Sequence, residues 1–500
     1  LFALFATSKK ASMSSYSTET ARNSGIPESS PGSSIALIVP TLLKNMIGAG
    51  IFSLPVGLRH ASPIPGLIIL GTIGVLSASS YWMIGYCCIS CRVNSFRDLW
   101  NMILGTRSAW FIDMTIFLNG WITLICYIIL IGDFTTKSFE GLLGSEHILA
   151  KNRALNQSVI TALVLLPLSL AKDLQRLAYT SILGLGVLVY VLFVVIHDSH
   201  LNSPPEISED VRMCNWNFGI FEAIALYCHA FVAHYNAPKV FSELANPTLA
   251  RWTVLVGIAY SVAFLVYAEF AWAGFRRFEY AVEGNVLRNY GPQLNILLAW
   301  LGMGFSIAFT YPLVFNSARE AAINLTLLVR QQWSSLPCLR DLIQSPRFRQ
   351  LQESYTGSSW QRRSEQLTRL LGPSPDSPNH KLAQKPGNKT TFLLVFLTYA
   401  VAVRCEDVGV VNALAGSVMG CMVCLVLPGL LFFYTCRMQC RAKVGGLQQS
   451  LLSKGSAEQW KTTTSRQMLL LAQLAGFLIF VFGVIFTVVG TAVILLHHWN

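Results

Sequence analysis

The chain has 500 residues, of which 53% are hydrophobic and only 12% charged, and its mean hydropathy is +0.49. Soluble globular proteins carry about 25% charged residues, so this composition excludes an ordinary soluble protein and indicates a polytopic membrane protein. The net charge of +12 comes from Lys and Arg scattered over the chain. That scatter fits the cytoplasmic excess that orients membrane helices better than it fits a nucleic-acid-binding face.

Eleven apolar segments approach the length of about 20 residues that a helix needs to cross a bilayer core. We therefore expect an all-α membrane protein with eleven transmembrane helices, of which the fourth and ninth are short. The expected spans, in chain order, are residues 35–58, 66–90, 109–133, 156–171, 178–197, 216–237, 252–275, 293–316, 390–403, 408–434 and 467–496.

Two polar regions lie outside these spans. Residues 1–34 are rich in Ser, Thr and Pro and are predicted to be a disordered tail, and residues 317–389 form a long loop whose first part continues the eighth helix. With the N-terminus in the cytosol, the inside segments hold more Lys and Arg than the outside loops, even without the long loop. This distribution predicts a cytosolic tail and loop and an extracellular or lumenal C-terminus, at the plasma membrane or a vacuolar or lysosomal membrane.

The first span contains the stretch "LLKNMIGAGIFSLP" (42–55), which is apolar but poor in helix formers. Glycine costs about 1 kcal/mol in a helix interior and proline about 3 kcal/mol. Unwound backbone is tolerated at membrane depth only where it faces protein or a water-filled cavity. Gly48, Ala49 and Gly50 therefore predict a broken helix beside a cavity, although glycines that allow close helix packing are the alternative.

The sixth span carries a similar interruption in "ALYCHAFVAHYNAPKVFSEL" (225–244). His229, His234 and Asn236 precede Pro238, which alternatively marks only the cytoplasmic end of the helix. Interruptions at matching positions of two halves indicate a transporter site. Spans 1 and 6 occupy matching positions if residues 35–197 are one half of the chain and residues 216–434 the other, with 467–496 outside both halves.

A broken helix offers backbone N–H groups at the start of its second half, here near Ile51, and free carbonyls at the end of its first half. A carboxylate fits the former and an ammonium group the latter, so an amino acid suits the site. Small and apolar residues near the breaks favour a neutral side chain. The candidate substrate-binding residues are Gly48, Ala49, Gly50, Ile51, His229 and Ala230, together with Asn119 of span 3, which an interhelical hydrogen bond explains equally well.

Several stretches resemble one known family, the amino acid/auxin permeases, which include sodium-coupled neutral amino acid transporters and proton-coupled vacuolar and lysosomal ones. The stretches that carry the resemblance are "TLLKNMIGAGIFSLP" (41–55), "CYIILIGDF" (126–134), "CHAFVAHYNAPKVFSEL" (228–244), "TYPLVFNSARE" (310–320) and "NALAGSVMGCMVCLVLPGLLFFY" (412–434). The resemblance implies eleven helices, arranged as a LeuT-like five-plus-five inverted repeat with broken helices 1 and 6 and one extra C-terminal helix. It also implies secondary transport of amino acids by alternating access.

The resemblance also suggests residues for ion coupling. Thr310 matches a threonine that serves the sodium site in relatives, but Lys44 stands where they have an asparagine, and Asn45 is one residue late, about 100° around a helix. A lysine stands there in some proton-coupled relatives, and its ammonium could take the place of the cation. Protons are therefore favoured over sodium as the coupling ion, and both remain open.

The proton carrier is open as well. Glu222 and His229 lie seven residues apart and hence on nearly the same helix face, and an imidazole titrates near neutral pH; alternatively, His229 only braces the break. The sequence predicts no enzyme, no cofactor beyond Na⁺ or H⁺ and no nucleic-acid partner. Its predicted partners are an amino acid and the lipid bilayer. A membrane amino-acid sensor with the same fold is the alternative function.

Overall fold

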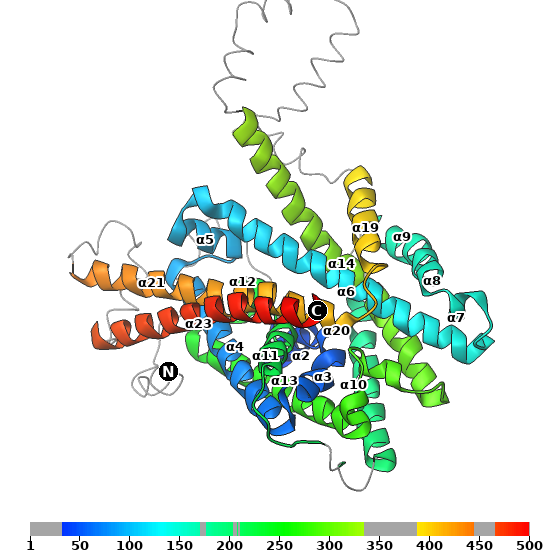
Figure 1. Ribbon diagram of the computed structural model, residues 1–500. Coiled ribbons are helices and arrows are strands. Elements are labelled where there is room, and N and C mark those ends of the chain that lie inside the picture. Colours follow the sequence, from blue (N-terminus) through cyan, green and yellow to red (C-terminus); the bar gives the residue numbers. More distant parts are fainter. Residues whose placement is uncertain are drawn as a thin grey trace, which may run out of the picture.

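The computed structural model describes residues 33–170, 177–203, 208, 211–334, 388–444 and 466–499. Within these residues the chain is helical and has no strand, only an isolated bridge between Ser33 and Leu244. The helices assemble into one bundle, in which segments from both halves of the sequence cross (Figure 1). The protein is therefore an all-α polytopic membrane protein, as predicted.

Eight single helical stretches of the described residues are long and apolar enough to cross a membrane, and a bent pair near the N-terminus makes a ninth. The sixth expected span is divided into helices that are too short to count alone, and the ninth is a shorter apolar helix, α19 (Asn388–Ala402). Membrane-length helices thus occupy nine of the eleven expected positions, and the structure does not establish the full count of eleven.

The first half of the chain contains a bent first span followed by four further spans. The bounds are α2 (Ile35–Met46), η1 (Ala49–Ser53), α3 (Leu54–Ala61), α4 (Pro63–Cys91), α5 (Phe96–Leu104), η2 (Thr106–Ser108), α6 (Ala109–Leu143), α7 (Ile148–Lys151), α8 (Arg153–Ile160), the π-helical turn η3 (Thr161–Leu165), α9 (Leu166–Leu170) and α10 (Leu177–Asn202).

The second half of the chain begins with a broken sixth span. The bounds are α11 (Gly219–Ala230), η4 (His234–Asn236), α12 (Ala237–Glu243), α13 (Leu249–Phe278), η5 (Glu279–Ala281), η6 (Val286–Asn289), α14 (Leu294–Ser334), α19, α20 (Val408–Ala415), the π-helical turns η7 (Gly416–Gly420) and η8 (Met422–Val426), α21 (Leu427–Val444) and α23 (Arg466–Trp499).

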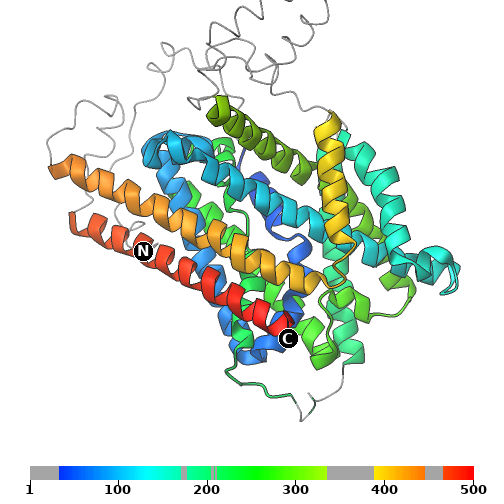
Figure 2. The ribbon, with the colours of Figure 1, turned by 45° about the horizontal axis from the view of Figure 1, so that its top comes forward.

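Helix α14 runs past the expected end of the eighth span to Ser334, which confirms that the helix continues into the predicted loop. The predicted tail at 1–34, apart from its last two residues, and the remainder of the loop at 317–389 lie outside the described residues. Helices α6 and α14 pack along each other across the bundle, and α21 and α23 run side by side at its edge (Figure 2).

Glycines allow α11 to lie against the tenth span with almost no space between the backbones. A Cβ built on Gly416 would lie 1.8 Å from the carbonyl oxygen of Ala225, and one on Gly420 would lie 3.2 Å from the backbone of Cys228. Without a hydrophobic driving force between helices in lipid, such close packing of small residues is a main source of helix association. It fixes the position of α11, which carries the second break.

Candidate functional site

The first span is broken at the glycines that the sequence singled out. Helix α2 ends at Met46, Ile47 and Gly48 are outside any helix, and the chain resumes as the 3₁₀ turn η1 before α3. The two parts differ in direction by 51°. Pro55 is in the first turn of α3, where its missing N–H costs no helix bond, so the break is made at Ile47–Gly48 and not at the proline. Regular α-helix begins at Leu54, slightly later than the predicted restart near Ile51.

The sixth span is also broken. Helix α11 ends at Ala230, residues 231–233 are non-helical, and η4 leads into α12. Pro238 is again in the first turn of the second part. Both predicted interruptions are therefore present as breaks in the helix, and neither proline is the residue at which the helix stops.

The two breaks touch each other. A Cβ built on Gly50 would lie 3.2 Å from the Cα of Ala230 and 3.4 Å from Cδ2 of His229. The neighbouring atoms at Ala230 are backbone, so a side chain at position 50 would require the two backbones to move apart. The Nδ1 atom of His229 is buried and has no hydrogen-bond partner among the described residues.

A tyrosine joins the two breaks. The hydroxyl of Tyr267, in α13, lies 2.8 Å from the carbonyl oxygen of Met46 and 2.8 Å from that of Ala230. These are the last carbonyls of α2 and α11, which lack partners within their own helices. Tyr267 is fully buried, and its position therefore stabilises both interrupted ends at once.

A pocket opens beside the first break, between it and helices α6, α10 and α14. Its polar side chains are one lysine and three hydroxyl-bearing residues, and the remainder of its surface is backbone and apolar side chains. The lining residues are Lys44, Ile47, Gly48, Ala49, Tyr127, Gly184, Leu185, Leu188, Met303, Ser306, Ile307 and Thr310.

Lys44 is the only charged residue of this lining. A Cβ built on Gly184 would lie 2.6 Å from Oγ of Ser306 and 3.7 Å from Nζ of Lys44, so the ammonium group reaches the space between α10 and α14. Thr310 is one turn beyond Ser306, and its hydroxyl donates to the Ser306 carbonyl at 2.8 Å. The pocket thus places the amine of one lysine close to hydroxyl oxygens and to the unwound backbone.

Four of the predicted site residues, Lys44, Gly48, Ala49 and Thr310, line this one pocket. Gly50, His229 and Ala230 form the contact between the two breaks, and Ile51 is buried next to it.

Three other predicted residues lie elsewhere. Asn45 turns away from the pocket, and its Oδ1 accepts a hydrogen bond from Tyr235 at 3.1 Å. Asn119 lies in α6 eight residues before Tyr127, about 12 Å along the helix. Glu222 contacts two histidines at one end of the bundle.

Tyr127, Ser306 and Tyr267 were not singled out from the sequence. Ser306 could have been found, because it precedes Thr310 by four residues and such pairs share a helix face. Tyr127 lies within the stretch 126–134 that resembles the family. Tyr267 carries no local signal, since its role depends on how α13 packs against two distant helix ends.

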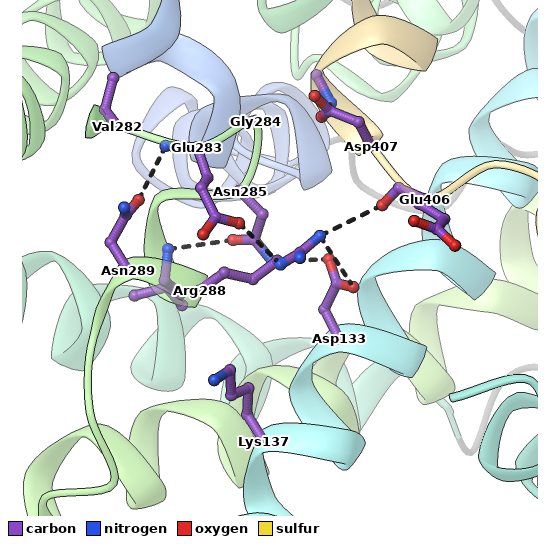
Figure 3. A network of polar contacts seen from close by, with 12 residues as sticks. Asp133, Lys137, Val282, Glu283, Gly284, Asn285, Arg288, Asn289, Glu406 and Asp407 are labelled. Carbon is purple, nitrogen blue, oxygen red and sulfur yellow. Dashed lines mark hydrogen bonds and ion pairs between the residues drawn. The ribbon is translucent and has the colours of Figure 1, made fainter. Parts of the chain in front are cut away.

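A network of polar side chains closes one end of the bundle near the break (Figure 3). At its centre is Asp133, whose side chain is buried and pairs with Arg153 at 2.9 Å. Asn285 donates to the same carboxylate at 3.2 Å, and Arg288 lies 4.0 Å away. Arg288 also pairs with Glu283 at 3.0 Å. The network ties α6 and α8 to the connection between α13 and α14.

That connection, residues 282–289, rests directly on the broken first span. The hydroxyl of Ser53, in η1, donates to the carbonyl of Gly284 at 2.7 Å and accepts from Asn412 at 2.9 Å. A Cβ on Gly284 would lie 1.8 Å from Oδ1 of Asp407, so glycine is required there. We call residues 282–289 the lid, because they cover η1 at this end of the bundle.

The sequence matches the model of the family described as "Transmembrane amino acid transporter protein" over residues 31–449, which is most of the chain. The chain belongs to this transmembrane amino acid transporter family. The match includes both breaks, the pocket and the lid, and it confirms the resemblance that the motifs indicated.

Named relatives of the chain include animal and fungal transporters. It is 29% identical over 299 residues to "Putative sodium-coupled neutral amino acid transporter 11" of Danio rerio, covering 58% of this chain and 66% of the relative. It is 25% identical over 300 residues to "Vacuolar amino acid transporter 7" of Saccharomyces cerevisiae, covering 58% and 59%. For "Vacuolar amino acid transporter 2" of the same yeast the identity is 23% over 315 residues, covering 61% and 65%. The chain thus spans slightly under two thirds of the length of these relatives.

Proposed function

We propose that the chain is a secondary active transporter that moves neutral amino acids across a membrane by alternating access. The observation that carries the proposal is the contact between two broken helices, Gly50 against Ala230, directly beside a pocket that contains Lys44. The relatives are named as amino acid transporters, which supports the same substrate class. Five helices before and five from α11 onward would form the inverted repeat, with α23 as an additional helix.

The pocket chemistry suits the two charged ends of an amino acid. Lys44 and the backbone N–H groups at the start of η1 can hold a carboxylate, and no side chain caps that start. The carbonyl at Ile47 and the hydroxyls of Ser306 and Thr310 offer acceptors to an ammonium group. The lining has no acidic side chain, so it favours neutral over cationic amino acids.

Protons are the proposed coupling ion. The Lys44 ammonium lies beside α14, the helix that carries Ser306 and Thr310, and fills the space that a bound sodium ion would otherwise need. A lysine exchanges a proton and not a metal ion, so coupling through Lys44 is coupling to H⁺. The proposed orientation, from the distribution of Lys and Arg, has a cytosolic N-terminus and an extracellular or lumenal C-terminus.

The test is uptake of labelled amino acids into proteoliposomes that contain the purified full chain. Proton and sodium gradients are imposed separately, and counterflow is measured without any gradient. We expect counterflow of neutral amino acids and uptake that follows the proton gradient. Uptake driven by sodium alone would contradict the coupling ion, and saturable binding without counterflow would indicate a sensor instead of a transporter.

A further inference from the structure

A second cluster of ionisable side chains lies apart from the pocket, where α3, α11 and α23 meet. The carboxylate of Glu222 lies 2.7 Å from Nδ1 of His497 through one oxygen and 3.3 Å from Nε2 of His60 through the other. The Glu222 side chain is only 3% exposed, whereas those of His60 and His497 are 15% and 61% exposed. A buried carboxylate is thus in contact with two imidazole rings that are partly exposed.

The three residues come from three different helices. His60 ends the second part of the broken first span, Glu222 starts the first part of the broken sixth span, and His497 is near the end of the last helix. Backbone packing holds the first two together, since a Cβ on Gly219 would lie 2.3 Å from the carbonyl oxygen of His60. His497 then attaches α23 to both interrupted spans.

His60 has a choice of partner. Its Nε2 atom lies 3.3 Å from Oε2 of Glu222 and 3.5 Å from Nη2 of Arg59. A guanidinium only donates and a carboxylate only accepts, so the contact with Glu222 needs a proton on Nε2 and the contact with Arg59 needs a lone pair there. The two contacts exclude each other as hydrogen bonds, and the proton on Nε2 decides between them.

Arg59 connects the protonation of His60 to the lid. Its Nη1 donates to the carbonyl of Val282, the first residue of the lid, at 2.7 Å. When Nε2 of His60 carries a proton, it donates to Glu222 and cannot accept from Arg59. The Arg59 guanidinium then keeps its hydrogen bond to the lid without competition from His60. When Nε2 has a lone pair, His60 competes for the guanidinium that holds the lid.

Few other charged side chains occur on the described helices that pack around the cluster. The helices that pack against α11 include α3, α4, α20 and α23, and α4 and α20 contain no acidic or basic side chain. Helix α3 supplies Arg59 and His60, and the described side chain that α23 supplies at this end is His497. Among the described side chains of these helices, the cluster contains one carboxylate, one guanidinium and two imidazoles.

We propose that His60, Glu222 and His497 form a proton-binding site that couples the last helix and the lid to the two broken helices. Imidazoles change charge between about pH 5 and 8. A protonated imidazole attracts a carboxylate and a neutral one does not, so the contacts of His60 and His497 with Glu222 should be stronger in acid than in alkali. The site responds to pH whether or not the chain transports amino acids, so its test is independent of transport.

The first test compares thermal unfolding of the purified full chain at about pH 5.5 and about pH 8, on either side of the histidine range. Glu222→Gln removes the negative charge and His497→Asn one positive charge. We expect each variant to unfold at a lower temperature than wild type. This decrease in the unfolding midpoint should be about 2–4 °C larger at the acidic pH than at the alkaline pH. His200→Asn, in α10, changes an exposed histidine outside the cluster and should show no such difference.

The second test follows the lid by hydrogen exchange of residues 282–289, with intrinsic exchange rates corrected for pH. In wild type, protection of the lid should be higher at the acidic pH. His60→Gln cannot take up a proton and should have the same protection at both pH values. The proposal is overturned if the variants of Glu222 and His497 lose equal stability at both pH values, or if lid protection in wild type does not change with pH.

Discussion

Gly50 and Ala230 are in backbone contact, so that a Cβ on Gly50 would lie 3.2 Å from the Cα of Ala230. These residues lie 180 positions apart in the sequence, and each is next to the break of its own span. Their contact brings the two breaks together into one region of the bundle, and it depends on the absence of a side chain at position 50.

Gly50→Ala should therefore weaken the contact between the two breaks. The neighbour is backbone and cannot rotate away, so the added methyl group should destabilise the fold by about 1–3 kcal/mol, as overpacked sites do, and should lower uptake in proteoliposomes. Gly186→Ala is the matched control, because nothing lies within 4 Å of a Cβ at that position of α10. Equal stability and uptake of the two variants would show that the contact is not required.

Tyr267→Phe should destabilise the protein by about 1 kcal/mol, the usual net contribution of a hydrogen bond. The variant keeps the ring and removes only the hydroxyl that lies 2.8 Å from two carbonyls. Tyr260→Phe, in the same helix, removes a buried hydroxyl without a partner among the described residues and should cost much less. The measurement is chemical or thermal unfolding of both variants, and a larger loss for Tyr260→Phe would contradict the assigned role.

Lys44→Ala should abolish uptake that follows a proton gradient, because it removes the only charged side chain of the pocket lining. Lys44→Asn restores the residue type of the sodium-coupled relatives and should show whether sodium then becomes effective. Lys137→Ala serves as the control, since Lys137 pairs with Glu140 on α6 away from the pocket. Proton-driven uptake that survives in Lys44→Ala would remove Lys44 from the coupling mechanism.

Asp133→Asn should destabilise the protein by about 3 kcal/mol, since breaking a buried ion pair leaves the opposite charge without compensation. Arg153 would lose its carboxylate partner, and the lid would lose one attachment through Asn285. Glu146→Gln is the control, because its pair with Lys151 is largely exposed and such pairs contribute little. If the two variants unfold at the same midpoint, the buried network does not hold this end of the bundle together.

The breaks could be predicted because their signals are local. Glycines at 48 and 50 and the stretch before Pro238 weaken a helix wherever it packs, so the sequence was sufficient to locate both interruptions. The pairing of Lys44 with Thr310 in one pocket followed from the family resemblance and not from spacing, since 266 positions separate them in the sequence.

The surroundings of Glu222 could not be predicted in the same way. Seven residues separate it from His229, which correctly gives one helix face, but that distance is about 10 Å along the helix. His229 lies at the break, whereas Glu222 lies at the other end of α11 with His60 and His497. Asn285 likewise lies 152 positions from its partner Asp133, and Tyr267 binds the ends of two separate helices. Only the packed bundle brings these groups together.

The position of Tyr267 has one more consequence. A phenol carries a single proton, yet two helix ends share it at equal distance. The two carbonyls share this hydrogen, and a small rotation of the hydroxyl directs it towards one or the other. If one of the two helix ends moved away, the hydroxyl would still have the other carbonyl as its acceptor, so the two ends would not have to be released together.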